Sequence, residues 1–424
     1  MRKVSRRVVL RGFICLLLLS GMMVVFSCMK SQFNSGQSQQ STSSYTIQQT
    51  LSDGAQQNTI AFDALGFMTG NLGSQTFLPP GKVADYAGFQ YLRDNDPTGL
   101  GHNTSFVTIV AYNVLHILNS SQIQLFINAA NTQISLLNIY AYKRFPLCKA
   151  FRRLLENDLP AGKTELDSSA VIEYSANLYK IDGEISYRRA QVYGQVIKSL
   201  STQQISQFNA LKALNGVAHW DSTLQNPLQS YNLSQDVNIA VMTYASEIYS
   251  WYTGSVNADV YFCPERQGTY FGSFYLKDWP AMGNPNFTIN SQLTANAGQD
   301  FLNVLTAPQS SRITGLVSLQ KGSLYALVGA RQDISVELRK FLSRSVADSS
   351  KIYSLSEDYG RDDGRIIYLF ATYFSNVYQS LTQQQKDQLK TLADDLGYID
   401  PSGAFLYSSP IAMPDIENTD FFFK

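Results

Sequence analysis

Two parts of this sequence repeat each other in the same order, and this repetition constrains the fold more than any other feature. The matching ranges are 61–94 with 245–278, 182–216 with 363–397 and, more weakly, 144–155 with 331–342. The offsets are 184, 181 and 187 residues, so the matches are collinear. Collinear matches at nearly one offset indicate an internal duplication. The sequence therefore predicts two homologous halves, residues 55–235 and residues 236–415.

Each half has the pattern of α-helices. In the second half, apolar residues recur at steps of three and four, at Ile366, Phe370, Tyr373, Val377 and Leu381. Such a stripe is typical of an amphipathic helix. The chain of 424 residues is 44% hydrophobic, which is ample for a buried core. We expect an all-α fold of two tandem homologous helical bundles with Pro/Gly/Tyr-rich connecting loops, pseudo-twofold packing and a groove between the halves.

A short pattern of leucine, a small polar residue and glutamine occurs four times. It covers residues 118–122, 200–204, 305–309 and 381–385. The pattern resembles the Leu-Thr-x-x-Gln motif of Spy/CpxP-type periplasmic helical proteins, and that resemblance implies a chaperone or stress-sensor role. The same residues fit a capping box, in which Ser, Thr or Asn precedes a helix and Gln follows three positions later. We favour capping, which predicts four helix–turn–helix junctions.

A second repeated pair is Asp182-Gly183, which recurs as Asp363-Gly364. We interpret both pairs as helix N-caps, because Asp is a favoured capping residue. Asp182-Gly183-Glu184 with Arg188-Arg189 could form a buried charged site. Glu184 and Arg188 stand four residues apart, however, a spacing that predicts an ordinary surface ion pair on a helix.

Residues 1–27 have the composition of a signal peptide. Basic residues come first, at Arg2, Lys3, Arg6, Arg7 and Arg11, and an apolar run from Phe13 leads to Cys28. The run is short for a membrane span and has the flanks of a signal peptide. Val25-Phe26-Ser27-Cys28 resembles a bacterial lipobox, which implies cleavage before Cys28 and attachment of a palmitate-bearing lipid to its sulfur. An ordinary signal peptide with a chance cysteine is the alternative interpretation.

The segment that follows supports the lipoprotein interpretation. Residues 31–58 are rich in Gln, Ser, Thr and Asn, a composition that predicts a flexible polar tether. We assign the lipidated cysteine and this tether to residues 28–54. Met29, rather than Asp, follows Cys28, and by resemblance to other lipoproteins this favours the outer membrane. We expect a lipid-anchored protein of the bacterial outer membrane that faces the periplasm or the cell surface. Residues 5–11 also resemble a twin-arginine signal, although a merely basic segment explains them too.

The charge balance bears on the partners of the chain. There are 33 basic and 33 acidic residues, and no basic excess indicates a nucleic-acid partner. Loss of residues 1–27 removes five basic residues and no acidic ones, so the mature chain has a net charge near −5. We therefore expect a membrane contact through the lipid, and a protein, peptide or glycan partner.

Candidate ligand-binding residues lie in two related stretches, 77–103 and 261–278. Each stretch has a cation, a Tyr and a Gly, followed by Tyr-Leu-cation-Asp. Clustered aromatics and fixed charges suit a binding loop. The candidates are Lys82, Tyr86, Arg93 and Asp94 in the first stretch and Arg266, Tyr270, Lys277 and Asp278 in the second. The alternative is architectural, with the ion pairs pinning each loop to a helix.

Two further site predictions concern metal and sulfur. Asp94, Asp96 and His102 lie in a stretch whose first residues match the start of a calcium loop, but Ser105 stands where the loop needs a bidentate acid, so any calcium site is weak. Cys148 and Cys263 remain after the signal peptide is removed and Cys28 is lipidated. They predict either one disulfide or two buried thiols.

Two function classes follow from these patterns. The first is a non-catalytic binding, scaffolding or chaperone-like protein that resembles the predicted lipoproteins of Gram-negative bacteria. The second is an exported enzyme or metal-binding protein with a site at Asp94–His102. The sequence has no Gly-x-Ser-x-Gly elbow and no Cys-x-x-Cys-His haem motif, and we assign no catalytic residue and no cofactor beyond weak calcium. Residues 416–424 form a C-terminal tail after the second half.

Overall fold

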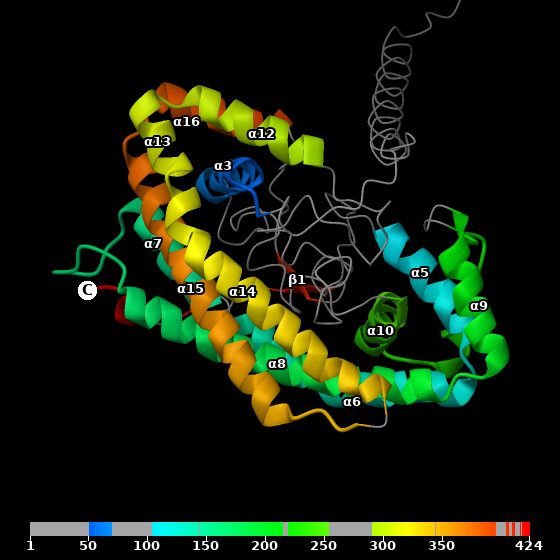
Figure 1. Cartoon of the computed structure of the whole chain (residues 1–424). Coiled ribbons are helices and arrows are strands. Elements are labelled where there is room, and N and C mark those ends of the chain that lie inside the picture. Colours follow the sequence, from blue (N-terminus) through cyan, green and yellow to red (C-terminus); the bar gives the residue numbers. More distant parts are fainter. Residues whose placement is uncertain are drawn as a thin grey trace, which may run out of the picture. The chain divides into compact units, whose positions relative to one another are not determined.

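The computed structural model describes the greater part of the chain (Figure 1). The described residues are 51–69, 104–143, 145–214, 219–253, 291–343, 345–395, 404–406, 409–411, 416 and 418–424. They belong to one compact unit, Tyr45–Lys424. The described chain is mainly α-helical, which confirms the predicted all-α class. The strands within it are β1 (Ala404–Leu406) and β2 (Ser409–Ile411), a short antiparallel pair in which Ala404 lies opposite Ile411.

The helices divide between the two predicted halves of the chain. In the first predicted half they are α3 (Asp53–Thr69), α5 (Thr104–Ile117), α6 (Ser120–Lys143), α7 (Phe145–Glu156), α8 (Ser168–Lys198) and α9 (Thr202–Ala213). In the second they are α10 (Gln235–Thr253), α12 (Ser291–Val304), α13 (Ala307–Thr314), α14 (Leu316–Leu338), α15 (Ser349–Gln379) and α16 (Gln383–Asp395). The 3-10 turns η4 (Gln229–Tyr231), η6 (Arg339–Leu342) and η7 (Asp420–Phe422) complete the order. The predicted domain boundaries stay predictions.

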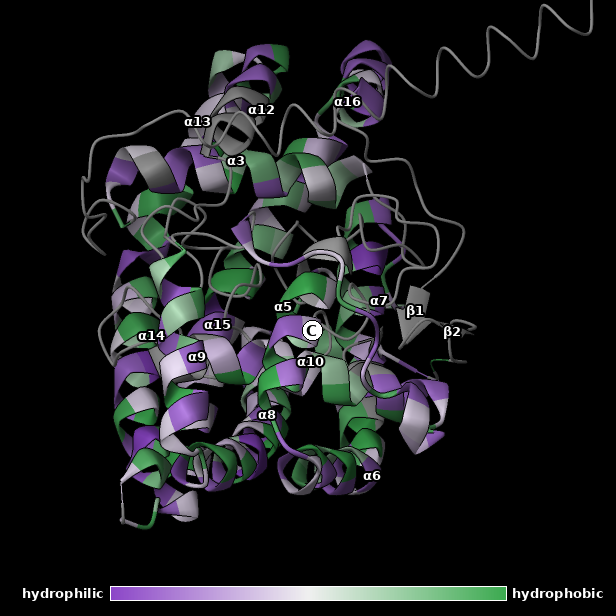
Figure 2. Ribbon diagram, turned by 90° about the vertical axis from the view of Figure 1, so that its right-hand side faces the viewer, coloured by the Kyte–Doolittle hydropathy of each residue, from purple (hydrophilic) through white to green (hydrophobic). Residues whose placement is uncertain are grey.

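The long helices α8 and α15 form the most extensive contact between two elements (Figure 1). Each begins behind an aspartate, because Asp167 accepts a hydrogen bond from the Ser169 amide and Asp348 accepts one from the Lys351 amide. The predicted stripe on α15 is confirmed, with Ile366, Phe370 and Val377 buried. Ribbons coloured by hydropathy show hydrophobic and hydrophilic residues alternating around the helices (Figure 2).

The predicted N-caps at Asp182-Gly183 and Asp363-Gly364 are wrong. Both pairs lie inside α8 and α15, where they are buried between the two helices. A Cβ atom at Gly364 would lie 2.8 Å from the Cα atom of Ile172, closer than real Cβ contacts come. Glycine is therefore required for the close approach of the helices and not for a cap. Asp363 accepts a hydrogen bond from the Ser175 hydroxyl across the same contact, at 3.4 Å.

The four predicted capping boxes are confirmed. Ser201 with Gln204, and Thr306 with Gln309, exchange reciprocal hydrogen bonds at the starts of α9 and α13. The same exchange joins Asn119 to Gln122 at the start of α6, and Thr382 to Gln385 at the start of α16. Each glutamine thus satisfies an amide that would otherwise lack a partner at a helix N-terminus.

The capping glutamines also meet in pairs, which we call the first and second glutamine clasps. In the first clasp, Gln204 Nε2 donates to Gln122 Oε1 at 2.7 Å and to the Ile117 carbonyl at 2.8 Å. In the second clasp, Gln385 Nε2 donates to Gln309 Oε1 and to the Val304 carbonyl, both at 2.9 Å. Each clasp therefore ties two helix N-termini to the end of a preceding helix, and each uses residues of one predicted half.

Other helix contacts cross between the predicted halves. Helix α3 packs most extensively against α12, and α10 packs most extensively against α5, as Figure 1 shows. Helix α7 packs against α15, and η6 packs against α8. The buried core consequently contains residues from both halves at each of these contacts.

Candidate functional site

Most of the residues that the sequence singled out lie outside the described part of the chain. They are Cys28, Lys82, Tyr86, Arg93, Asp94, Asp96, His102, Cys263, Arg266, Tyr270, Lys277 and Asp278. Their predicted roles in lipidation, ligand binding, calcium binding and disulfide formation stay predictions. Among the described residues, no group of three His, Cys, Asp or Glu side chains is arranged to hold a metal ion.

Cys148 is the one candidate residue that the structure describes. It is buried on α7. Its side chain lies close enough to Tyr174 to affect that residue's ionisation. Burial raises the pKa of Tyr174 to about 12, with a smaller contribution from Cys148. Tyr174 is therefore a neutral phenol, and its hydroxyl donates to the Lys143 carbonyl at 2.7 Å.

The described helices fix the ends of the two candidate binding segments. Residues 70–103 leave α3 at Thr69 and enter α5 at Thr104, while residues 254–290 leave α10 at Thr253 and enter α12 at Ser291. Because α3 packs on α12 and α10 packs on α5, both segments run between the same two helix pairs. Each helix at an end of one segment therefore packs against a helix at an end of the other segment.

A buried ion pair joins α8 to α10. Arg189 donates from Nη1 to both carboxylate oxygens of Glu247, at 3.1 and 3.0 Å, and both side chains are 0% exposed. The Tyr193 hydroxyl donates to Glu247 Oε2, and the Arg189 guanidinium lies 5.0 Å from the centre of the Tyr244 ring. Burial raises the pKa of Tyr193 well above its usual value, and the negative charge of Glu247 raises it further. The cluster connects the two predicted halves without contact with solvent.

The described tail, Ile416 and residues 418–424, packs against α7 and the start of α8, and we call it the tail segment. It contains the 3-10 turn η7, and only its end is extended. Leu166 and Phe423 form an antiparallel bridge. The Asp167 amide donates to the Phe422 carbonyl at 2.7 Å, and the Lys424 amide donates to the Glu165 carbonyl at 2.9 Å. The chain just before α8 therefore pairs with residues 422–424 through a single bridge.

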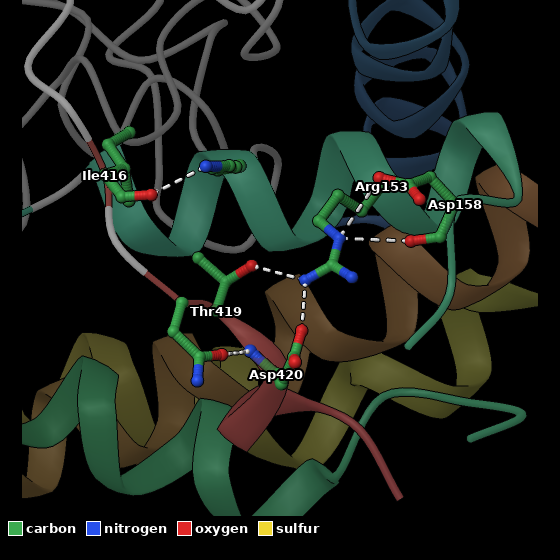
Figure 3. A network of polar contacts seen from close by, with 7 residues as sticks. Arg153, Asp158, Ile416, Thr419 and Asp420 are labelled. Carbon is green, nitrogen blue, oxygen red and sulfur yellow. Dashed lines mark hydrogen bonds and ion pairs between the residues drawn. The ribbon is translucent and has the colours of Figure 1, made fainter. Parts of the chain in front are cut away.

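Two cations of α7 hold the tail segment from the other side (Figure 3). Arg153 Nη1 donates to Thr419 Oγ1 at 2.9 Å and to Asp420 Oδ1 at 2.7 Å. Arg153 Nε donates to the Asp158 carbonyl at 3.0 Å, which fixes the direction of the guanidinium. Lys149 Nζ donates to the Ile416 carbonyl at 2.6 Å. An arginine held in this way can recognise an acidic residue at one position of the tail segment.

Aromatic residues of the tail segment supply its apolar contacts. Phe422 and Phe423 are buried, whereas Phe421 is 55% exposed. The Phe422 ring lies 5.0 Å from the ring of Tyr174, and the Arg153 guanidinium lies 5.1 Å from the centre of the Phe423 ring. The arrangement as a whole binds Asp420 and the aromatic residues after it, with Asp420–Phe422 in the 3-10 turn η7 and Phe423 in the bridge to Leu166.

The corresponding position before α15 is organised differently. The Asp348 amide donates to Glu337 Oε1 at 2.8 Å, so a side chain does there what the Phe422 carbonyl does before α8. Glu337 is buried and also binds Lys340, at 2.7 Å, and Lys351, at 3.4 Å. Burial raises the pKa of Glu337, but the hydrogen bonds from the Asp348 amide, Lys340 and Lys351 outweigh burial, so the pKa is lowered.

The sequence alone does not predict the two clusters that the structure shows most clearly. It admits a buried charged site at residues 182–189, which include Arg189, but favours a surface pair there, and it gives no role to Glu247 or Arg153. One signal is present, because Glu247 is the only charged residue of α10 after Asp236, and a charge in such a place predicts a buried partner. The surface pair of Arg188 with Glu184 was predicted correctly.

Comparison with protein-family models, with curated proteins and with solved structures finds no match for this chain. In the part of the chain that the structure describes, no helix is long and apolar enough to span a membrane.

Proposed function

We propose that this chain is an exported lipoprotein, anchored at Cys28 in the bacterial outer membrane, that acts as a non-catalytic binding or scaffolding protein. The basic and apolar signal segment, the lipobox-like residues before Cys28 and the polar residues before α3 support the anchor. Residues 53–58, the end of the predicted polar stretch, belong to α3 and not to a tether. A lipid followed by a flexible tether would hold the helical unit near the membrane while leaving its surfaces accessible.

The observation that carries the binding role is the shared attachment of the two aromatic-rich segments. Residues 70–103 and 254–290 each connect the α3–α12 pair with the α10–α5 pair. Tyr86 and Tyr270 would therefore belong to segments whose ends are attached to the same two helix pairs. Such segments could form a two-part binding surface for a peptide, protein or glycan. The tail segment adds a chemical precedent, because the scaffold binds an acidic–aromatic sequence of its own.

We further propose that the unit arose by duplication and that its two homologous halves interlock. Helices α8 and α15 correspond at an offset of 181 residues, and α5 and α12 correspond at 187. The two glutamine clasps use the same types of donors and acceptors at the same offsets. The first helix of each half packs on a helix of the other half, since α3 contacts α12 and α10 contacts α5.

Lipidation is tested by growing cells with labelled palmitate and following the label on the protein. We expect Cys28→Ser to lose the label and to leave the membrane fraction, because the proposed acyl chain is joined to that sulfur. Cys15→Ser is the matched control, since it changes a cysteine within the signal segment. Retention of the label by Cys28→Ser would refute the anchor.

Partner binding is tested by cross-linking in cells, recovery from detergent-solubilised membranes and mass spectrometry. We expect Tyr86→Ala and Tyr270→Ala to reduce recovery of the same partner to a comparable degree. Tyr325→Ala is the control, because Tyr325 is an exposed tyrosine on α14. A stoichiometric metal that is lost in Asp96→Ala, together with unchanged partner recovery in the tyrosine variants, would favour the enzyme or metal-binding alternative.

Interlocking is tested with a protease site placed at residues 215–218, between α9 and the start of the second half. After cleavage, we expect the two fragments to elute together and to separate only in denaturant. Independent bundles would separate in native buffer, and that result would contradict the interlocked arrangement.

A further inference from the structure

We propose that the outward face of α14 docks on the lipid surface of the membrane, with its apolar side chains among the headgroups and the upper parts of the acyl chains. The inference rests on the proposed lipid anchor at Cys28, because it adds a second contact with the membrane that the anchor would reach. It names the surface of the helical unit that takes part in anchoring. A helix with this role lies in the plane of the membrane surface.

Exposed apolar residues gather on α14. Eight large hydrophobic residues in the described part of the chain are exposed, and three of them, Leu319, Tyr325 and Val336, belong to this helix. None of the other described elements holds more than one. At 3.6 residues per turn, Tyr325 and Val336 lie almost directly above each other, and Leu319 lies about a quarter of a turn to one side. The three residues therefore form one face, which we call the α14 face.

Small residues make the α14 face open between these side chains. A Cβ atom built at Gly322 or Gly329 would have no neighbouring atom within 4 Å, so both positions look outward. In Figure 2, α14 lies along the left side of the described helices. The exposed charged residues of α14 are only Lys321 and Asp333. A helix face in contact with water is usually richer in charge.

The neighbouring helix α15 shows this difference. Its outer side carries several ion pairs, among them Arg361 with Asp358 at 3.0 Å and Arg365 with Asp362 at 2.6 Å. The α14 face has no comparable series of charges among the described residues of that helix. The two helices pack on each other, so the contrast lies between adjacent parts of one surface.

Under the proposed duplication, the first half lacks the α14 face. Polar residues stand at the three equivalent positions, and at an offset of 187 they are Thr132 for Leu319, Asn138 for Tyr325 and Lys149 for Val336. Lys149 binds the tail segment there. The apolar face is therefore not required by the architecture that the two halves would share, and a separate role explains it better.

The position of the predicted tether identifies the membrane as the occupant of the α14 face. The chain that leads from Cys28 enters the helical unit at Leu51, which is buried, and Asp53 then binds Lys321 of α14 at 3.0 Å. Residues 29–50 lie between the cysteine and this point, and a flexible chain of that length spans roughly 25 Å. Helix α14 is itself about 35 Å long. The anchor would therefore hold the first turns of α14 closer to the membrane than the length of that helix.

The composition of the α14 face suits a lipid surface. Tyrosine is favoured at the level of the headgroups, because its ring is apolar and its hydroxyl is polar. Leu319 and Val336 can enter the apolar layer, and Lys321 can meet phosphate groups at its edge. So few apolar residues bind a membrane weakly by themselves. The tether compensates, since it raises the effective concentration of the face at the membrane to about the millimolar range.

The test places a photoreactive benzophenone amino acid at single positions of the full-length protein, in cells whose lipids carry labelled phosphate. We expect illumination to join labelled lipid to the protein when the probe replaces Tyr325 or Val336. Ile139, an exposed apolar residue on α6, is the matched control and should give no labelled adduct, because it is as exposed as Val336 but lies on another helix. Leu319→Glu should reduce the adduct at Tyr325, since a carboxylate opposes entry into the apolar layer.

Three outcomes would overturn the proposal. They are absence of labelled lipid at Tyr325, equal labelling at Ile139, and cross-linking of Tyr325 to a protein in place of a lipid. The palmitate label at Cys28 is followed in the same samples. If the palmitate label is present and the lipid adduct is absent, the docking of α14 is wrong while the anchor holds. If the palmitate label is absent too, the proposed anchor fails as well.

Discussion

Under the proposed duplication, the contact of α8 with α10 corresponds to the contact of α15 with α3, but the two differ in chemistry. The first contains the buried ion pair of Arg189 and Glu247. In the second, Phe370 and Phe374 stand for Arg189 and Tyr193 at an offset of 181, and the Phe374 ring lies 5.6 Å from the ring of Phe67 on α3. Asp63 stands for Glu247 at an offset of 184 and is buried too. The first contact is therefore a charged solution, and the second is an aromatic solution that keeps one buried carboxylate.

The two solutions should respond differently to damage. A buried ion pair depends on both members, because loss of one leaves a charge in a medium that cannot solvate it. An aromatic cluster loses contacts and area in proportion to what is removed. Comparing the free energies of unfolding of variants at the two contacts will therefore measure how much the stability of the ion pair depends on the presence of both its members.

The largest effect is expected for Glu247→Ala. The change removes the carboxylate that Arg189 and Tyr193 bind, and breaking a buried pair in this way costs about 3–5 kcal/mol. Urea unfolding followed by circular dichroism measures the loss. The double variant Arg189→Leu with Glu247→Leu should cost less than the single variant, because no unpaired charge remains. A double variant that is less stable than Glu247→Ala would contradict this account.

The next effect concerns the clasps, where the two halves are alike. Gln204→Ala and Gln385→Ala each remove a capping bond and a clasp, for a cost of about 2 kcal/mol. Because the two networks use equivalent partners, we expect equal losses of unfolding free energy within about 0.5 kcal/mol. Gln383→Ala, which changes an exposed glutamine at the start of α16, is the control. Unequal losses would show that the two clasps differ in their contribution to stability although their hydrogen bonds are equivalent.

A smaller loss is expected for Phe374→Leu in the aromatic contact. The substitution keeps an apolar side chain but loses the edge contact with Phe67, which costs about 1–2 kcal/mol. The same unfolding experiment measures it. A loss as large as that of Glu247→Ala would mean that the aromatic contact is as dependent on one residue as the charged contact.

Local features of the fold were predictable from the sequence, and contacts between distant residues were not. The four capping boxes and the stripe on α15 depend on residues three and four apart, so their spacing specifies them. The error at Gly183 and Gly364 has the opposite cause. These glycines allow the close contact of α8 with α15. The sequence pattern of one helix does not indicate which other helix lies close to it.

The site residues show the same division. The partners Arg189 and Glu247 stand 58 residues apart, and Arg153 meets Asp420 from 267 residues away, so neither contact has a sequence spacing that predicts it. The sequence did place a binding function in the stretches around Tyr86 and Tyr270, and that hypothesis rests on composition and repetition alone. Knowledge of which helices pair was needed to relate the ends of these two segments.

The smallest effect concerns pH and distinguishes the starts of α8 and α15. The lowered pKa of Glu337 means that its carboxylate stabilises the folded chain at pH values above its ordinary pKa of 4.5. This contribution is lost as the pH falls below 4.5 and through the lowered pKa. The start of α8 has no such dependence at the equivalent bond, because the Phe422 carbonyl does not titrate.

We expect Glu337→Gln to reduce the acid sensitivity of unfolding between neutral pH and pH 3, when stability is measured at a series of pH values. Lys351→Met should shift the acid transition upward, since it removes one of the groups that lower the pKa. An unchanged pH profile in both variants would show that the start of α15 does not depend on the Glu337 charge.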